Sequence, residues 1–180
     1  MLDKVGLRFT MMTFDDFVNY LKKNPEDSVI WTNFGIYCKR LGQYDKAIYC
    51  HTKAIQINPN FAEAYNNRAC AKKAIGDNTC LEDVYTAIRI NPDFAEAYNN
   101  LGNIEHQLGL SQQAIEHYKK ALLLGQRVDF YMNLAIVQAS TGDKLNAINN
   151  ICNALRITED EELKARLRIS LKELEAAVKL

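Results

Sequence analysis

The sequence has few residues that interrupt helices and no excess of charge of either sign. Its 180 residues include only 3 prolines and 8 glycines, about half the usual share of these two residue types. Lysine plus arginine and aspartate plus glutamate number 22 each, so the net charge is zero. Proteins bind nucleic acids and anionic membrane surfaces largely through excess lysine and arginine. The charge balance therefore argues against a nucleic-acid partner and against a membrane partner.

Long apolar runs and secretion features are also missing. No apolar run approaches the roughly 18 residues that a membrane-spanning helix needs. Residues 1–12 lack the apolar core of a secretion signal and show no clear period, so we expect a frayed N-terminal tail. The five cysteines are odd in number and irregularly spaced, which predicts reduced thiols and a cytoplasmic protein.

The few prolines and glycines recur at a fixed interval. Each proline follows an asparagine, and prolines, glycines and one aromatic position all repeat at 33 or 34 residues. The recurring residues are Pro25, Pro59 and Pro92; Gly42, Gly76, Gly109 and Gly142; and Trp31, Tyr65, Tyr98 and Tyr131. Such a period is typical of an array in which each repeat is one supersecondary element.

The apolar spacing within a repeat is that of helices. Trp31, Phe34 and Cys38 are spaced to share one helix face. Gly42 is expected to end this first helix, because glycine adopts the left-handed cap conformation without a Cβ clash. A second helix then ends before Pro59, because the residue before proline is disfavoured in the helical region. Each repeat is therefore predicted as a pair of helices joined by a glycine turn.

Small residues recur where the paired helices must approach closely. They form two series on one face of the second helices, seven residues apart: Ala47, Cys80, Ala114 and Ala147, then Ala54, Ala87, Ala121 and Ala154. Helix axes come as close as ~8 Å only where the contact residues are small. We therefore predict that both series are buried.

Together these residues resemble the tetratricopeptide repeat. The third repeat matches its pattern with Tyr98, Leu101, Gly102, Ala114, Tyr118 and Ala121, and the first with Trp31, Phe34, Gly35, Ala47, Ala54 and Pro59. The second repeat departs from the pattern at Arg68, Ala69 and Cys80, and the fourth at Ala135. The resemblance implies an all-α fold, a right-handed α-solenoid of antiparallel helix pairs, with repeats at 28–61, 62–94, 95–127 and 128–159.

Both flanks of the repeats are predicted to be helical. Thr13 can cap a helix that ends at Asn24-Pro25, so residues 13–27 are predicted to form an N-terminal capping helix. Thr158 to Glu161 fits a capping box for a second amphipathic helix. We interpret residues 160–180 as the C-terminal cap that a solenoid needs, with a dimerisation helix as the alternative.

One residue of each first helix lies opposite the predicted buried side. Two positions after the aromatic, about 200° around the helix, every repeat has an asparagine: Asn33, Asn67, Asn100 and Asn133. Amides both donate and accept hydrogen bonds, so such a row could hold the backbone of an extended peptide in a concave groove. The arrangement is similar to the asparagine ladder in the repeats of O-linked N-acetylglucosamine transferase. The alternative is that these amides bond only between neighbouring repeats.

Other side chains of this face are mixed in character. Ile36 is apolar, Asn103 is polar, and Arg40 and Lys73 are basic; all four join the predicted peptide-binding set. The basic residues near the helix ends of the first two repeats are Lys39, Arg40, Lys72 and Lys73. If these charges select a ligand, they favour one with acidic groups; a solvated face is the alternative.

A heat-shock chaperone tail is disfavoured as the partner. Members of the family that bind such tails clamp the terminal carboxylate with two lysines, an arginine and two asparagines. The matching positions here are Thr32, Ile36, Asn67, Glu96 and Asn100. Only Asn67 agrees, and Glu96 reverses a required charge.

No catalytic or metal-binding pattern is recognisable. Zinc sites need close ligand pairs such as Cys-x-x-Cys, and none occurs. Cys50 and His51 are adjacent and would point about 100° apart on a helix, so His51 is predicted to be a core residue. His106 and His117 have no acid at metal or triad spacing, and no glycine-rich phosphate loop is present. We expect no enzyme, no metal and no cofactor.

The predicted function is therefore protein or peptide binding. The chain would serve as an adaptor, scaffold or assembly factor, with its partner in the concave groove. One alternative is a structural subunit that self-associates as a homodimer through the solenoid ends or the last helix. Another is a regulatory repeat region of a larger enzyme.

Overall fold

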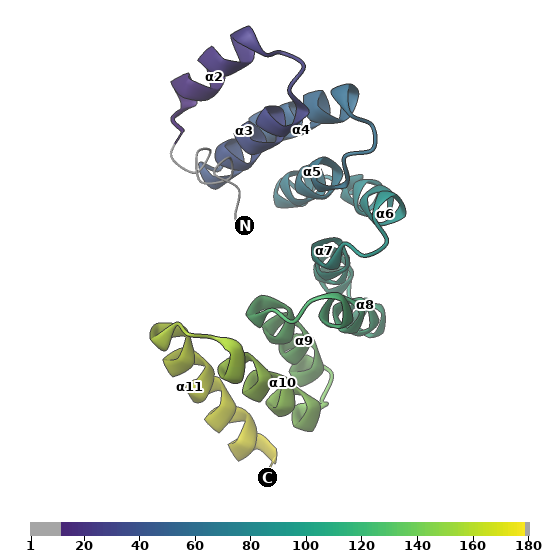
Figure 1. The fold of residues 1–180 in the computed structure, drawn as a ribbon. Helices are drawn as coiled ribbons and strands as arrows, with labels where there is room; N and C mark the ends of the chain where they lie inside the picture. The colour runs from purple at the N-terminus through teal and green to yellow at the C-terminus, as the bar shows by residue number, and fades with distance from the viewer. Residues whose placement is uncertain (1–11, 179–180) are drawn as a thin grey trace. The chain divides into compact units, whose positions relative to one another are not determined.

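The computed structural model describes residues 12–178, so all but the last residue of the predicted tail lies outside the described residues. Within that range the regular elements are ten α-helices, with no strand (Figure 1). They are α2 (Phe14–Lys23), α3 (Ser28–Arg40), α4 (Tyr44–Ile57), α5 (Ala62–Ala74), α6 (Cys80–Ile90), α7 (Ala95–Gln107), α8 (Ser111–Leu124), α9 (Val128–Ser140), α10 (Lys144–Ile157) and α11 (Glu161–Val178). The predicted all-α class is confirmed.

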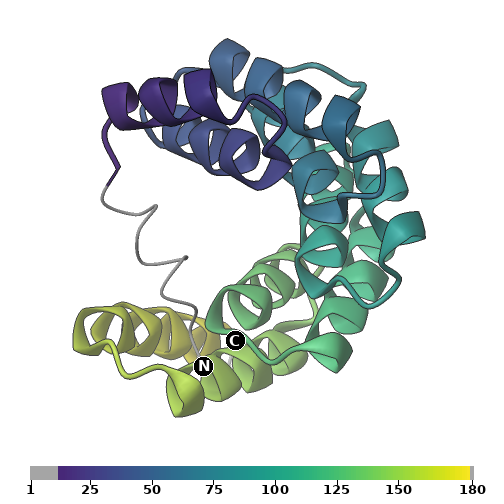
Figure 2. The ribbon, with the colours of Figure 1, turned by 45° about the horizontal axis from the view of Figure 1, so that its top comes forward.

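The chain divides into two compact halves, which are described separately. The N-terminal half comprises residues 1–92 and the C-terminal half residues 93–180. In the first, α3 packs on α4 and α5 on α6; in the second, α7 packs on α8 and α9 on α10. The turns within these pairs are short, so the two helices of a pair run antiparallel, as expected. Figures 1 and 2 both show α11 alongside α10 in the C-terminal half.

Glycine ends the first helix of each pair in the predicted way. Among the described residues, the only positive φ angles belong to Gly42, Gly76, Gly109 and Gly142, at 72°, 76°, 79° and 86°. A side chain with a Cβ disfavours this left-handed conformation, whereas glycine does not. The repeating glycines therefore set the reversals of the chain.

The predicted small contact residues are buried. All eight positions of the two series are inaccessible to solvent except Cys80, which is 5% exposed. The aromatic and aliphatic side chains beside them complete the core; in the N-terminal half, for example, the Phe17 ring of α2 stacks on Phe34 of α3 with 5.1 Å between ring centroids. Small residues are thus buried in the second helix of every pair, where they permit close helix packing.

The two flanking helices start differently. At α2, the Thr13 hydroxyl accepts a hydrogen bond from the Asp16 amide (3.3 Å) and the Asp16 carboxylate accepts one from the Thr13 amide (2.9 Å), which is a capping box. At α11, the expected capping by Thr158 is wrong. The Asp160 carboxylate accepts from the amides of Glu162 and Leu163 (2.9 and 3.1 Å). Thr158 lies two residues before Asp160, too far from the first turn to cap it, and its hydroxyl accepts from the Asp160 amide instead (3.3 Å).

Candidate functional site

In the N-terminal half, the predicted asparagines lie on neighbouring first helices. Asn33 is on α3 and Asn67 on α5, and these helices contact each other. Both side chains are half-buried. The Asn33 amide donates to the Val29 carbonyl one turn earlier, at 2.9 Å. Its oxygen and second N–H are not used by that bond, so the amide retains hydrogen-bonding capacity.

In the C-terminal half, one of the asparagines bridges two repeats. The Asn133 amide of α9 donates to the Asn99 oxygen of α7 at 2.9 Å. Asn99 is buried, whereas Asn133 and Asn100 are half-buried. Asn133 therefore follows the alternative stated for these amides, in which they hydrogen-bond between neighbouring repeats. Its own oxygen and second N–H are not used by this bond.

Asn103 is held in place by a buried tyrosine. The Tyr118 hydroxyl donates to the Asn103 oxygen at 2.8 Å. Burial, and then the charge of Glu105, raises the pKa of Tyr118 to about 12, so the hydroxyl is protonated and acts as a donor at neutral pH. This bond leaves the NH2 group of Asn103 as the part that could meet a ligand.

The basic residues of the N-terminal half have different roles. Arg40 is exposed and Lys73 half-buried, and neither forms an ion pair with any residue from 12 to 178. Ile36 is half-buried on the same helix as Arg40. Lys72, which the sequence placed with the surface charges, instead contacts Asp83 at 2.9 Å. Arg40 and Lys73, the two charges of the predicted peptide-binding set, therefore remain available to a ligand.

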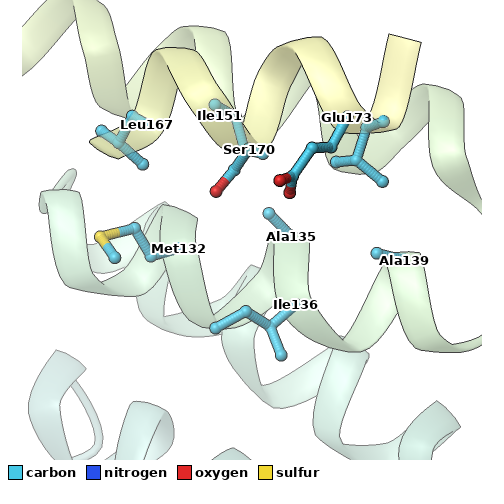
Figure 3. Close-up of a pocket in the computed structure, with 9 residues that line it drawn as sticks. Met132, Ala135, Ile136, Ala139, Ile151, Leu167, Ser170 and Glu173 are labelled. Atoms are coloured by element: carbon cyan, nitrogen blue, oxygen red, sulfur yellow. The ribbon is translucent and has the colours of Figure 1, made fainter. Parts of the chain in front are cut away.

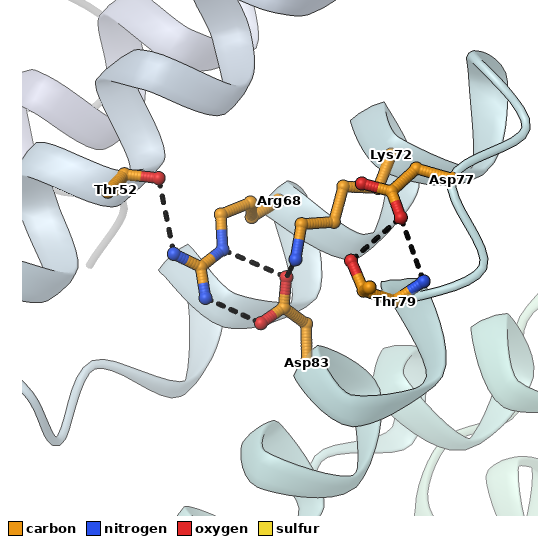
Figure 4. A network of polar contacts seen from close by, with 6 residues as sticks. All are labelled: Thr52, Arg68, Lys72, Asp77, Thr79 and Asp83. Atoms are coloured by element: carbon orange, nitrogen blue, oxygen red, sulfur yellow. Dashed lines mark hydrogen bonds and ion pairs between the residues drawn. The ribbon is translucent and has the colours of Figure 1, made fainter.

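A buried ionic network joins three helices of this half (Figure 4). Asp83 of α6, with a side chain only 5% exposed, accepts from Arg68 Nε and Nη2 at 2.8 and 2.6 Å. Arg68 Nη1 also donates to Thr52 of α4 at 3.2 Å. Arg68 occupies the position that holds leucine in the family pattern. Its acidic partner, Asp83, lies on the facing helix α6. These charges are satisfied internally, so they are not available to a ligand.

The expectation that His117 lacks an acid is wrong. His117 Nδ1 on α8 lies 2.6 Å from a carboxylate oxygen of Glu105 on α7, and the Glu105 side chain is 4% exposed. The imidazole also stacks on the Tyr98 ring, with 6.2 Å between centroids. Sequence spacing could not find this pair because the two residues lie on different helices. No serine, threonine or cysteine among the described residues hydrogen-bonds to the pair.

The other suspected catalytic group is a core residue, as predicted. His51 is fully buried, and neither ring nitrogen has a hydrogen-bond partner among residues 12–178. Burial lowers the pKa of His51 to about 3, with the charges of Lys39 and Arg68 acting in the same direction. Burial also raises the pKa of the adjacent Cys50 thiol to about 12. A neutral histidine beside a protonated thiol is not an activated pair.

The structure adds a pocket that the sequence did not indicate. It lies between α9 and α11 in the C-terminal half and has a volume of about 330 Å³ (Figure 3). Its walls are mainly apolar, with two polar side chains on α11. The principal lining residues are Met132, Ile136, Leu167, Ser170, Glu173 and Leu174. Only the packing of the last helix against α9 and α10 creates this space.

Residues 12–178 contain neither a metal-binding cluster nor a membrane-spanning helix. No group of three or more His, Cys, Asp or Glu side chains is arranged to hold a metal ion there. None of the helices in that range combines the length and apolarity needed to cross a membrane. The five cysteines are free thiols, and only Cys152 is exposed.

Comparison with known proteins gives consistent matches to repeat proteins. A family model described as TPR repeat matches residues 36–76, and two described as tetratricopeptide repeat match residues 17–49 and 95–125. The peroxisomal targeting signal receptor of Candida glabrata is 33% identical over 64 residues, which is 36% of this chain. The match spans 11% of that receptor's length, about a tenth.

Solved structures show the same fold. The crystal structure of MamA is 25% identical, has a TM-score of 0.66, and is matched over 84% of this chain and 88% of its own. A thermophilic TPR protein of Thermus thermophilus, TTC0263, is 21% identical with a TM-score of 0.77, over 90% of this chain and 88% of its own.

Proposed function

Because the chain belongs to the tetratricopeptide repeat family, we propose that it is a non-enzymatic protein-interaction module that binds an extended peptide segment of a partner protein. In the N-terminal half a segment would contact the asparagine-bearing face of α3 and α5. In the C-terminal half the corresponding face is that of α7 and α9. The observation that carries this proposal is the recurrence of half-buried asparagine amides on successive first helices. Amides on rigid helices can bond to peptide backbone whatever its side chains.

The proposed cellular role is that of an adaptor, scaffold or assembly factor in the cytoplasm. The matched receptor of Candida glabrata is named for a peroxisomal targeting signal. Five free thiols suit a reducing compartment.

The charges of the N-terminal half suggest the chemistry of the bound segment. Arg40 and Lys73 lack an acidic partner among the described residues, so we propose that acidic groups of the segment lie near α3 and α5. Ile36 and Glu96 occupy positions where carboxylate-clamp members need polar and basic side chains. A terminal carboxylate of a chaperone is therefore not the proposed ligand.

The amide faces can be tested with peptides selected from a random display library on the intact protein. The double variant Asn33→Ala, Asn67→Ala removes two amides from the N-terminal half without touching the Asn133–Asn99 bond. Each lost hydrogen bond contributes about 0.5–1.5 kcal/mol, so affinity should fall by about tenfold or more, while the melting temperature is retained. The matched control is the double variant Asn19→Ala, Asn149→Ala. Both asparagines are exposed, and they lie on α2 and α10, outside the first helices of the repeats. Equal affinities for both double variants would refute the amide-face proposal.

Self-association is a second candidate, favoured by exposed apolar side chains near the C-terminus. Leu145 on α10 is 66% exposed and Ile169 on α11 is 59% exposed. Light scattering over a range of concentrations separates the candidates. A constant monomer mass supports the peptide-binding module, whereas a concentration-dependent dimer that selects no peptide supports the structural subunit.

A further inference from the structure

One pair of positions meets across the two helices of every repeat. The first position lies on the first helix, seven residues after the repeating aromatic, and the second lies on the second helix, four residues before the series Ala54, Ala87, Ala121 and Ala154. In the second, third and fourth repeats the two side chains are in polar contact. These pairs are Lys72 with Asp83 at 2.9 Å (Figure 4), Glu105 with His117 at 2.6 Å, and Gln138 with Asn150 at 2.7 Å. The two positions therefore face each other in each of these helix pairs.

In the first repeat both of these positions are cysteines. Cys38 of α3 is fully buried and Cys50 of α4 is 2% exposed, and both belong to the core of the N-terminal half. Their thiols are in hydrogen-bonding contact. The shared register with the three polar pairs and this contact both place the two sulfur atoms together.

The packing around the two thiols suits a disulfide. Cys50 lies between Ala47 and Ala54 on a face of α4 that is fully buried at both alanines. Small residues allow helix axes to approach closely, and a disulfide needs its two Cα atoms within about 7 Å of each other. The remaining cysteines stand at other positions of their repeats, namely Cys70, Cys80 and Cys152. The fold therefore selects one pair of cysteines out of five.

Burial protects both thiols while α3 stays packed on α4. It raises the pKa of Cys38, and it raises the pKa of Cys50 to about 12. Because the thiolate is the nucleophile, the packed pair is unreactive at neutral pH. Cys38 lies two residues before the end of α3 at Arg40, and helix ends open more readily than helix centres. Opening of that last turn would give a small oxidant access to Cys38.

We propose that Cys38 and Cys50 form a reversible disulfide that joins α3 to α4 when a low-molecular-weight disulfide, such as glutathione disulfide, accumulates. The Cys38 thiol loses its proton and attacks one sulfur of the small disulfide, whose S–S bond breaks and releases one thiolate. The Cys50 thiolate then attacks the Cys38 sulfur of the mixed disulfide and displaces the second small thiolate. Two protein thiols are oxidised, one small disulfide is reduced to two thiols, and the two protons pass to the released thiolates.

The bond acts on a helix of the proposed peptide face. It closes a loop through the turn at Gly42 and fixes α3 against α4, and α3 carries Asn33 and Arg40. In a reducing compartment the pair remains a dithiol. It responds when the small disulfide is in excess over the corresponding thiol.

The test measures whether folding favours the bond. The intact protein is unfolded in urea with mixtures of reduced and oxidised glutathione, and is then either kept there or refolded by dilution into the same mixtures, so that burial does not limit access of the oxidant. Free thiols are blocked with N-ethylmaleimide, and mass spectrometry of a digest quantifies the peptides joined through Cys38 and Cys50. The equilibrium constant for this bond should be larger by about tenfold or more in the folded protein than in urea. A smaller enhancement overturns the proposal, because the fold would then not hold the two sulfurs in position.

Two further readouts complete the test. Cys70→Ala, which removes another cysteine of the same half, should leave the constant unchanged, whereas bonds from Cys38 or Cys50 to Cys70 or Cys80 at similar levels overturn the assignment. The linked protein should melt several degrees higher than the reduced protein, and an unchanged or lower melting temperature counts against the bond. None of these readouts involves peptide binding, so this inference and the proposed function fail separately.

Discussion

The His51 ring on α4 lies directly against Gly35 on α3. A Cβ built on Gly35 would be 2.5 Å from His51 Cε1, closer than side chains tolerate. The same contact recurs in the C-terminal half, where a Cβ on Gly102 would be 2.8 Å from the Tyr118 ring. In both pairs the ring residue follows the glycine by sixteen positions. The family glycine is therefore required by the flat side chain that packs on it.

We predict that Gly35→Ala destabilises the protein by about 1–3 kcal/mol, because the buried His51 ring has no space into which to move. Urea unfolding followed by circular dichroism measures the change. Gly125→Ala is the matched control, since its new Cβ would meet only the Ala95 Cβ at 3.8 Å, an ordinary contact. A Gly35→Ala protein as stable as the control would show that the ring is not fixed.

The buried neutral state of His51 predicts a stability that depends on pH. Its pKa is about 3 in the folded protein and about 6.5 in an unfolded chain, so the unfolded state binds more protons between these values. Stability should therefore be fully present above pH 6.5 and decrease as the pH falls towards about 3. The His51→Phe variant should lose this part of the pH dependence.

His51→Phe should also be at least as stable as the natural sequence at neutral pH. The substitution removes two ring nitrogens that have no hydrogen-bond partner in the described part of the chain, and burying such groups without hydrogen bonds is costly. Tyr118 shows that a six-membered ring fits against the corresponding glycine. Urea unfolding at about pH 7 and about pH 4.5, on either side of the unfolded-state pKa, gives the comparison. Parallel acid destabilisation of both proteins would contradict the assigned role, because other groups would then cause the whole effect.

Asp83 neutralises two basic side chains in the N-terminal half, so its removal should be costly. We predict that Asp83→Asn destabilises by about 3–5 kcal/mol, because Arg68 and Lys72 would remain partly buried without a counter-charge. The control Asp129→Asn removes an exposed acid paired with Arg127 and should cost no more than about 1 kcal/mol. Thermal melting distinguishes the two. Similar melting temperatures would mean that the network adds little to stability.

Part of the candidate site could be placed from the sequence and part could not. Helical arithmetic put Asn33, Asn67, Asn100 and Asn133 at equivalent positions, and the structure finds all four half-buried on first helices. The same arithmetic could not say that Asn133 bonds to Asn99 or that Lys72 turns to Asp83. Those contacts depend on which side chain of a neighbouring helix lies opposite the asparagine or lysine in the folded protein.

The sequence by itself determined the helix pairs, their glycine reversals and their small contact residues. These features are local and periodic, so propensity, capping and spacing act within a few residues of each position. Only the tertiary structure decided the Glu105–His117 and Arg68–Asp83 pairs and the pocket of α9 and α11. Each of them arises where helices meet across a turn or between repeats, and the distances involved are set by packing rather than by position along the chain.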